Sequence, residues 1–558
     1  MIRGLNEPRR AAAWTAAAIS VGVVLAAQFP HLQAWRANRL GYYPDKVYTG
    51  ALNTGAEDTA TYWSWMQQAR AGRFFFEDLY TSEDHPRDYV NVFFWILGGI
   101  TRLSRAGVPF VYAASRPLVG AVVLWLLWRA ATVLFAKPWE QLAFYLMALL
   151  PGGFEGLFCF LERNRGLGHV SSPGWWIPEM NTFFSLVLFP HFLAGFAVMI
   201  AIFLLMLRAW REGARGGRLA IGAGLLLCAL TFFHPYDTVT MLAVLWSAPV
   251  AFAIAERRLP RAEIAATAVA TAVWLPSLVY NWLLFLGNPA MRAWDLQNLM
   301  DTPEPGRLAF AFGIAGALAI VALAGIRRMT RPQLAMAAWF VSSLVLIHLP
   351  LRFQRRMIGG IQFPIAALAV FTLATWVVPA VLRLLRGHRL VPANGLPVLG
   401  AVLLLGSVQW LTPFYLLDIE KAQERRVAFP CWIRRSESDA LRWIRNHTPQ
   451  DAVVLGSYEM GNYVPAFAIR RCVLGHYGLT IDAKTKREEV ARFFSGDAAD
   501  DAWRRDLVRR YSVDCVIWTE HERALGGFDP ASVPWLREVF RTGDGEARAL
   551  VYAVETGP

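Results

Sequence analysis

Residues 181–218 read NTFFSLVLFPHFLAGFAVMIAIFLLMLRAWREGARGGR, a long apolar run that ends in four arginines. About eleven apolar stretches of this kind follow one another from near the N-terminus to Tyr415. Several of them have roughly 18 to 27 residues and few charges, which is the length that spans the hydrocarbon core of a bilayer. The pattern predicts a polytopic α-helical membrane protein with about eleven transmembrane helices.

The composition supports the same class. The chain has 558 residues, of which 55% are hydrophobic and 17% charged, and its mean hydropathy is +0.34. A soluble domain has about a quarter of its residues charged. The net charge of +13 would suit nucleic acid, but most arginines stand at the ends of apolar stretches, where the positive-inside rule and anionic lipid explain them. We therefore expect membrane lipids, and no nucleic acid, as partners.

The arginines also predict the topology. Short arginine-rich loops alternate with longer loops rich in aromatic and acidic residues, and the positive-inside rule puts the former in the cytoplasm. The N-terminus is then cytoplasmic, with an uncleaved first span, and the C-terminal residues face outward. Segment 90–105 is short and ends in Arg102 and Arg105, so we expect an interfacial helix after the first outer loop, 30–88. The predicted spans are 11–29, 110–135, 139–159, 181–207, 219–234, 238–255, 262–286, 308–326, 333–350, 358–383 and 395–415.

The composition changes after the last apolar stretch, which predicts a membrane domain over 1–416 and a soluble extracytoplasmic domain over 417–558. The soluble part alternates helical and strand patterns, typical of a small α/β domain. Cys472 and Cys515 could form a disulfide in this compartment, although unpaired core cysteines are favoured, and no cysteine spacing suits zinc. We expect helices over 436–446, with Ser436 as N-cap, 487–494 and 502–510, and strands over 452–455, 472–474, 515–518 and 550–554.

Glu57 and Asp58 are the first candidate site residues. They lie together in the first outer loop, followed by Tyr62, Trp63 and Trp65. Adjacent carboxylates beside aromatic residues can supply a general base or bind a divalent cation. The same residues also fit a helix start, with Asp58 or Thr59 as N-cap.

Three histidines are weaker candidates. His85 follows Glu83 in the same loop and could move protons or bind phosphate, or the stretch could be a solvated turn. His234 stands with Asp237 at the outer end of span 219–234, where ionisable groups indicate function or a cap. His191, deeper in its span, is better explained as a buried core histidine.

Arg352, Arg355 and Arg356 form a basic cluster on the outer side, against the positive-inside rule. Arginine forks bind phosphate oxygens in bidentate fashion. The cluster would suit the phosphate of a lipid-linked donor, and the alternative is an anchor for lipid headgroups. Because topology does not explain these charges, the phosphate site is favoured.

The sequence contains no P-loop, G-x-S-x-G, H-E-x-x-H or dinucleotide-binding fingerprint. The acidic first outer loop, the interfacial helix, the many spans and the outward α/β domain together resemble the GT-C superfamily of integral-membrane glycosyltransferases. Residues 55–72, the stretch from Tyr80 to His85, and Phe353-Gln354-Arg355-Arg356 look like uncharacterised bacterial members of that superfamily.

The resemblance implies an enzyme of the bacterial inner membrane. It would transfer a hexosyl or pentosyl group from a polyprenyl-phosphate-linked donor to a glycan, lipid or protein acceptor on the outer face. Asp58 would be the general base, and Glu57 would assist it or hold a divalent cation, so that metal use stays open. Arg355 and Arg356 would hold the donor phosphate. The remaining residues expected to line the cavity are Glu83, His85 and His234.

The stretch from Ser457 to Tyr463, followed by Arg470-Arg471, is similar to the region around the Trp-Trp-Asp motif of oligosaccharyltransferase catalytic subunits. That motif itself is absent, so peptide recognition and metal dependence are not carried over. Two other functions compete with glycosyl transfer. A transporter or lipid flippase of envelope glycan precursors predicts internal repeats, which we do not find. A non-catalytic scaffold of a glycan assembly complex predicts no turnover.

Overall fold

The computed structural model describes residues 7–52, 54–150, 153–154, 173–385, 427–496 and 500–555. The predicted span 395–415 and Cys159 lie outside these residues. Contacts between residues divide the chain into two compact units. The first comprises Met1–Phe29, Ser115–Leu278 and Met300–Ile419, and the second Pro30–Ala114, Val279–Leu299 and Glu420–Pro558. The second unit thus combines the C-terminal residues with the first long loop.

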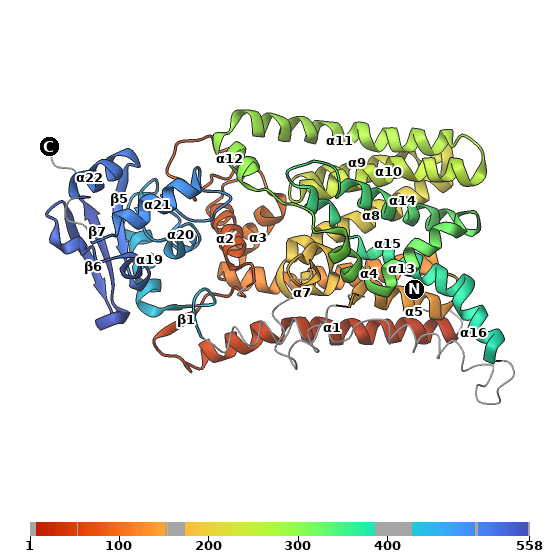
Figure 1. Cartoon of the computed structure of the whole chain (residues 1–558), viewed down its shortest axis with the longest axis horizontal. Helices are drawn as coiled ribbons and strands as arrows, with labels where there is room; N and C mark the ends of the chain where they lie inside the picture. The colour runs from red at the N-terminus through yellow and green to blue at the C-terminus, as the bar shows by residue number, and fades with distance from the viewer. Residues whose placement is uncertain are drawn as a thin grey trace. The chain divides into compact units, whose positions relative to one another are not determined.

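The first unit consists of apolar helices. Within it α8 packs on α9, α10 on α14, and α13 on α15 (Figure 1). Three helices, α1, α4 and α11, give residues to both units. The helices are α1 (Glu7–Arg39), α4 (Val108–Leu134), α5 (Pro138–Leu149), α7 (Thr182–Leu188), α8 (Pro190–Glu212), α9 (Gly217–Thr231), α10 (Pro235–Glu256), α11 (Arg261–Gly287), α13 (Pro305–Ala322), α14 (Arg331–Leu346), α15 (Gln362–Thr372) and α16 (Val378–Leu385).

Seven helical segments among the described residues, one of which comprises α8 and α9, are long and apolar enough to cross a membrane. This confirms a polytopic α-helical membrane protein, while the count of about eleven spans stays a prediction. The seven are Glu7–Arg39, Val108–Leu134, Pro190–Thr231, Pro235–Glu256, Arg261–Gly287, Pro305–Arg328 and Gln362–Val381.

The predicted span 181–207 is not one continuous helix. Asn181 caps α7, and the chain breaks at Phe189, whose backbone is extended, before Pro190 starts α8. Proline disfavours the helical conformation of the residue before it, which accounts for the break. The Phe189-Pro190 dipeptide in the sequence was the available signal.

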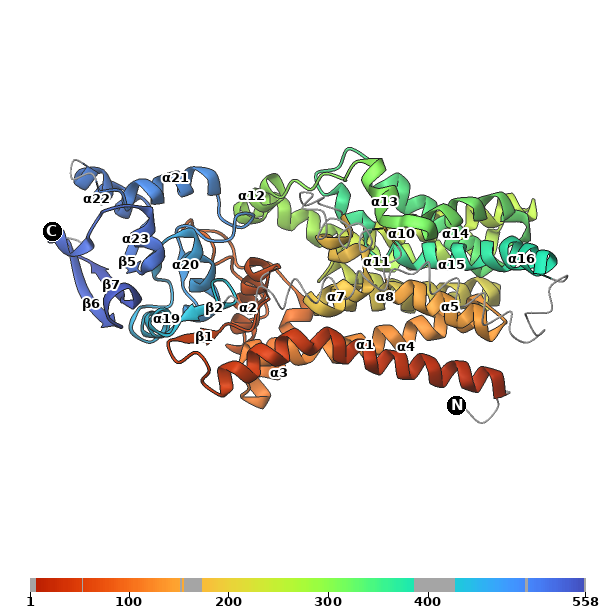
Figure 2. The same ribbon diagram turned by 60° about the horizontal axis from the view of Figure 1, so that its bottom comes forward.

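The second unit contains the predicted α/β domain (Figure 2). Its five-stranded sheet has the order β4-β3-β5-β7-β6, in which β3 runs parallel to β4 and β5, while β7 is antiparallel to β5 and β6. The strands are β3 (Val453–Leu455), β4 (Arg471–Cys472), β5 (Val513–Trp518), β6 (Leu536–Thr542) and β7 (Ala549–Val554), and the helices are α19 (Arg435–His447), α20 (Tyr458–Tyr463), α21 (Ala483–Phe493), α22 (Asp501–Arg510) and α23 (Glu520–Leu525).

Local patterns predicted most of this domain, but strand β6 and the short helices α20 and α23 were not predicted. Ser436 is not the N-cap of α19, since the helix starts one residue earlier and is capped at Arg434. Cys472 and Cys515 are both buried and unpaired, as favoured.

The first long loop folds together with this domain. Strand β1 (Lys46–Tyr48) pairs antiparallel with β2 (Trp432–Arg434). The backbone N–H of Cys472 donates to the carbonyl of Leu79 at 3.0 Å, and the hydroxyl of Tyr80 donates to the carbonyl of Asn462 at 3.2 Å. The unit also holds α2 (Ala56–Arg70), α3 (Val92–Ser104), which packs on α2, and α12 (Pro289–Gln297).

The short helix predicted over 90–105 is α3. Asn91 caps it by accepting a hydrogen bond from the N–H of Phe94. Phe94 and Leu97 are buried on one face, whereas Trp95, Ile96, Ile100 and Leu103 are exposed. An exposed apolar face of this kind is typical of a helix that lies in a membrane interface, which stays the interpretation of this element.

Candidate functional site

Glu57 and Asp58 occupy the first turn of α2. The helix begins after Gly55, whose φ of 74° is left-handed, and no side chain caps it. The predicted helix start is therefore present, but Asp58 and Thr59 lie inside the helix and neither is its N-cap. Carboxylates in the first turn are favoured by the unpaired N–H groups and the helix dipole. The rest of α2 is largely buried, so packing holds in place the helix that carries the two carboxylates.

Each carboxylate has a partner from the C-terminal residues. Oδ1 of Asp58 lies 3.1 Å from Nε2 of His476, and the hydroxyl of Tyr458 donates to Oε2 of Glu57 at 2.6 Å. The side chain of Asp58 is 44% exposed, whereas that of His476 is 17% exposed. The solvent-facing carboxylate is therefore oriented by a more buried ring.

The environment of His476 fixes its tautomer. The N–H of Gly478 donates to Nδ1 at 3.2 Å, so the proton of the neutral ring is on Nε2 and is directed at Asp58. Burial disfavours the imidazolium, but the hydrogen bond and charge of Asp58, with Glu57 and Asp78 nearby, outweigh burial and raise the pKa of His476. The pair can hold a carboxylate in one orientation and exchange a proton with it.

The other loop residues predicted as ligands have partners of their own. Glu83 forms an ion pair at 2.7 Å with Lys486, which is 1% exposed. Burial opposes the charge on Glu83, but Lys486 and the Thr81 hydroxyl outweigh it and lower the pKa of this carboxyl. His85 uses both ring nitrogens on the backbone, since it contacts the carbonyl of Glu83 at 2.8 Å and accepts from the N–H of Asp78 at 3.1 Å. His85 thus braces the loop, and its contact with substrate stays a prediction.

Glu77 is a charge centre that the sequence did not indicate. Its side chain is 3% exposed and lies 2.7 Å from Arg471, 2.6 Å from Arg87 and 3.6 Å from Arg73. Arg471 also pairs at 2.8 Å with the exposed Asp84. These contacts join the first long loop to β4. Glu77 and Arg471 are nearly 400 positions apart, so no local pattern in the sequence predicts their pairing.

Asp78 follows Glu77 and is buried. The N–H of Tyr80 donates to its Oδ1 at 2.8 Å, while Oδ2 has no hydrogen-bond partner among the described residues. Burial raises the pKa of Asp78 to about 6, against the opposing effects of the Tyr80 N–H, His85, His476 and Lys486. Asp78 is therefore a buried acid near His476 whose charged form is disfavoured by burial.

The arginine cluster lies in the first unit, on the short helix η5 (Gln354–Ile358). Arg355 places its guanidinium 4.7 Å from the ring centre of Trp176 and donates to the sulfur of Met300 at 3.3 Å. Arg356 forms an ion pair with Glu179, a buried carboxylate, and lies 5.8 Å from the ring centre of Phe192. The charge of Arg356 is thus already compensated by Glu179, and a bound anion would compete with that carboxylate.

His234 and Asp237 are also in the first unit. They form a buried pair at the start of α10, with Nδ1 2.8 Å from Oδ2. A small cavity is lined by this pair together with Glu179, Phe192 and Gly359. A Cβ on Gly195 or on Gly359 would lie within 2.7 Å of the Asp237 carboxylate, so a larger residue at either position would displace that carboxylate. His191 is buried beside His234, with ring centres 6.1 Å apart.

The structure thus gathers the predicted residues in two groups, each within its own unit. Glu57 and Asp58 meet His476 and Tyr458, whereas Glu83 and His85 belong to the fold of the loop. The second unit adds His476, Lys486 and Arg471, none of which was predicted as a site residue. One local signal could have indicated His476: it stands between two glycines in Gly475-His476-Tyr477-Gly478, a pattern typical of a tight turn. Arg355, Arg356 and His234 lie in the first unit.

No protein-family model matches the chain, and no curated protein matches it in sequence. Solved structures do match. An oligosaccharyltransferase of Archaeoglobus fulgidus tethered to an acceptor peptide has a TM-score of 0.53 and 13% identity over 90% of this chain and 69% of its own. ArnT of Cupriavidus metallidurans in the apo state has a TM-score of 0.53 and 12% identity over 97% of this chain and 98% of its own.

Two further structures carry ligands. AglB of Archaeoglobus fulgidus, with an inhibitory peptide and a dolichol-phosphate, has a TM-score of 0.53 and 12% identity over 96% of this chain and 74% of its own. ArnT bound to undecaprenyl phosphate has a TM-score of 0.51 and 13% identity over 97% of this chain and 99% of its own. Identities this low establish the fold alone. In fold alone they agree with the resemblance inferred from the sequence: this multi-pass membrane chain has the fold of these structures.

Proposed function

We propose that this chain is a glycosyltransferase that moves a hexosyl or pentosyl group from a polyprenyl-phosphate-linked donor to a glycan, lipid or protein acceptor. The reaction would take place on the outer face of a bacterial inner membrane, with the N-terminus cytoplasmic and the domain 417–558 outside. The fold shared with ArnT bound to undecaprenyl phosphate, and with AglB in complex with a dolichol-phosphate, supports a lipid-linked donor.

The observation that carries the proposal is the Asp58–His476 pair. Asp58 is a partly exposed carboxylate at the start of a buried helix, and Nε2 of His476 orients it at 3.1 Å. A general base must be held in place and remain accessible to its substrate. Among the acidic residues predicted for the site, Asp58 meets both requirements, whereas Glu83 is neutralised by a buried lysine.

In the proposed reaction Asp58 accepts the proton of the acceptor hydroxyl while the oxygen attacks the anomeric carbon of the donor sugar. The bond from that carbon to the phosphate oxygen breaks, and the polyprenyl phosphate leaves with the electron pair. Arg355 and Arg356 would bind the phosphate and stabilise the charge that grows on it. The proton then passes from Asp58 to solvent.

The remaining predicted residues have supporting roles. Glu57, held by the Tyr458 hydroxyl, would assist Asp58 or bind a divalent cation. We also propose that three further residues line the substrate cavity, namely Glu83, His85 and His234. Phosphate binding by Arg356 would be weakened by Glu179, because the phosphate competes with that carboxylate for the guanidinium.

The test is sugar transfer or donor hydrolysis by the full-length protein in nanodiscs, supplied with a panel of polyprenyl-phosphate sugars. Asp58→Asn should lower turnover by about 10²- to 10⁴-fold, since it removes base catalysis, and should leave donor binding intact. Arg356→Lys keeps a partner for Glu179, and it should weaken donor binding because an ammonium cannot form the bidentate contact.

The matched control is Asp439→Asn, which changes an acidic residue of α19 paired with Arg442 on the surface. It should retain full activity. Full turnover in Asp58→Asn would remove that residue from the mechanism. If folded wild-type protein turned over no donor in the panel, the transporter and scaffold functions would replace the enzyme.

A further inference from the structure

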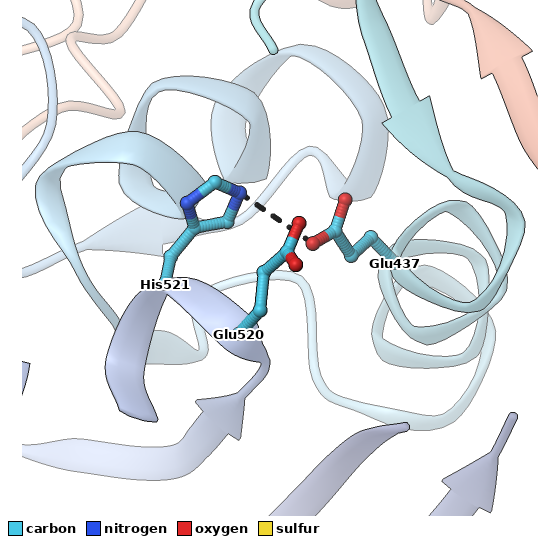
Figure 3. Close-up of side chains that lie close together, drawn as sticks. All are labelled: Glu437, Glu520 and His521. Atoms are coloured by element: carbon cyan, nitrogen blue, oxygen red, sulfur yellow. Dashed lines mark ion pairs between the residues drawn. The ribbon is translucent and has the colours of Figure 1, made fainter. Parts of the chain in front are cut away.

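Glu437, Glu520 and His521 point toward one another in the second unit (Figure 3). Glu437 lies in the first turn of α19, directly after β2, while Glu520 and His521 open α23, directly after β5. One ligand atom from each of the three residues lies within 4.8 Å of the others. None of these residues takes part in the proposed transfer chemistry.

The three side chains are held by contacts that leave ligand atoms available. The N–H of Arg434 donates to Oε2 of Glu437 at 2.8 Å as part of the cap of α19. The hydroxyl of Thr519 accepts from the N–H of His521 at 3.2 Å and so fixes the start of α23. Arg434 also donates to Oε2 of Glu520, which orients that carboxylate. Metal-binding carboxylates are commonly oriented by such outer hydrogen bonds.

Two ligand atoms face each other without a hydrogen bond. Oε1 of Glu437 and Nε2 of His521 are both buried and have no hydrogen-bond partner among the described residues. The Glu437 side chain is only 2% exposed, and the two atoms are 3.5 Å apart. Tetrahedral Zn²⁺ with bonds of about 2.0 Å separates its ligand atoms by about 3.3 Å. The buried carboxylate oxygen and the imidazole nitrogen that pairs with it (Figure 3) are therefore spaced as two ligands of one cation would be.

The charges favour a cation as well. Glu437 is a buried carboxylate, and a carboxylate oxygen of Glu520 lies within 4.8 Å of its ligand atom. Glu522 is satisfied separately by the N–H groups of Ser457 and Thr519. Arg434 already forms an ion pair with Glu520, so a divalent ion would chiefly neutralise Glu437 and offset the cost of burying its charge.

We propose that Glu437, Glu520 and His521 form a structural metal site for a divalent transition ion, with Zn²⁺ as the preferred ion. One imidazole nitrogen and two carboxylate oxygens suit a borderline ion such as Zn²⁺ better than Ca²⁺ or Mg²⁺, which prefer oxygen ligands alone. Water would complete the coordination. The ion would fasten the start of α19 to the start of α23, and thereby β2 and its partner β1 to the central strand β5.

The test uses the full-length protein in nanodiscs with its affinity tag removed and treated with a chelator. Titration with Zn²⁺ against a chromophoric chelator should give one bound ion per chain and a higher thermal midpoint. Co²⁺ should give visible absorption bands typical of a protein site with nitrogen and oxygen ligands. Neither readout depends on sugar transfer.

Glu520→Gln and His521→Asn each remove one ligand and leave Glu437, whose Oε2 accepts from the N–H of Arg434, in place. Each should weaken Zn²⁺ binding by more than about 10-fold and abolish the gain in thermal midpoint. Glu546→Gln and His447→Asn change the same residue types away from the cluster and should bind Zn²⁺ as the wild type does. No stoichiometric Zn²⁺ in the wild type, or equal binding in all four variants, would show that the cluster is an ion-pair network only.

Discussion

Two acidic stretches of the first long loop, Glu57-Asp58 and residues 77–85, are similar in sequence but have opposite surroundings. Asp58 is 44% exposed and contacts a histidine, whereas Glu77 is 3% exposed and contacts arginines. Glu83 is paired with a buried lysine. The second stretch therefore uses its charges to join the loop to the C-terminal residues, and the first keeps one charge accessible.

The difference shows how to separate acids that fold a protein from acids that can act on a substrate. A buried carboxylate is tolerated where cations neutralise it, and removing either partner is then expensive. A base for catalysis needs a donor that orients it without neutralising it permanently. On this criterion Asp58 belongs to the site and Glu77 to the fold.

The largest effect on the fold should come from Glu77→Ala. The change leaves Arg471, Arg87 and Arg73 without their shared partner, and breaking a buried pair costs roughly 3–5 kcal/mol. We expect a clearly lower thermal midpoint and rapid proteolysis of the loop in nanodisc-embedded protein. A wild-type midpoint would mean that Glu77 does not hold the loop to β4.

His476 should affect turnover more than stability. His476→Ala removes the N–H that orients Asp58, and misplacement of a catalytic group by about 1 Å can cost about 10²-fold. The acidic limb of the pH–rate profile should move to higher pH, since the carboxylate loses a donor that stabilises its charged form.

His476→Gln supplies the control, because an amide N–H can still reach Asp58 and should restore part of the rate. A purely structural role would lower the amount of folded protein and leave the pH profile unchanged. An unchanged profile in His476→Ala would therefore separate His476 from the site.

Asp78 is a buried acid without a cation in direct contact, and its substitution tests how much burial of the charge lowers stability. Burial raises its pKa from 3.8 to about 6, so the folded protein binds this proton more tightly than the unfolded chain does. The free energy of unfolding then falls as the pH rises from about 4 to about 6, and the penalty is complete above that range.

Asp78→Asn mimics the protonated acid and retains the acceptor for the Tyr80 N–H. It should stabilise the protein by roughly 2 to 3 kcal/mol near pH 8 and give no gain near pH 4. Thermal unfolding at the two pH values measures the difference. Destabilisation at both would show that the carboxylate has a partner that depends on its charge.

The same contrast explains what could be predicted from the sequence. Apolar stretches and amphipathic segments are local, so the membrane helices, α19, α21, α22 and the strands β3, β5 and β7 were found. The helix break before Pro190 was also predictable locally, because proline disfavours the helical conformation of the residue before it. The pairing of Asp58 with His476 spans 418 positions, and no local pattern encodes it. The candidate base could therefore be named from the sequence, but its partner could not.

The smallest effect should come from Asp84→Asn, which removes the other partner of Arg471. The carboxylate of Asp84 is 98% exposed, whereas that of Glu77 on the same arginine is 3% exposed. The hydrogen bond from Arg471 lowers the pKa of Asp84, but solvent screens exposed pairs and Arg471 retains Glu77. We expect an unchanged thermal midpoint and unchanged turnover. If Asp84→Asn were as damaging as Glu77→Ala, burial would not decide which acids of this loop hold the fold.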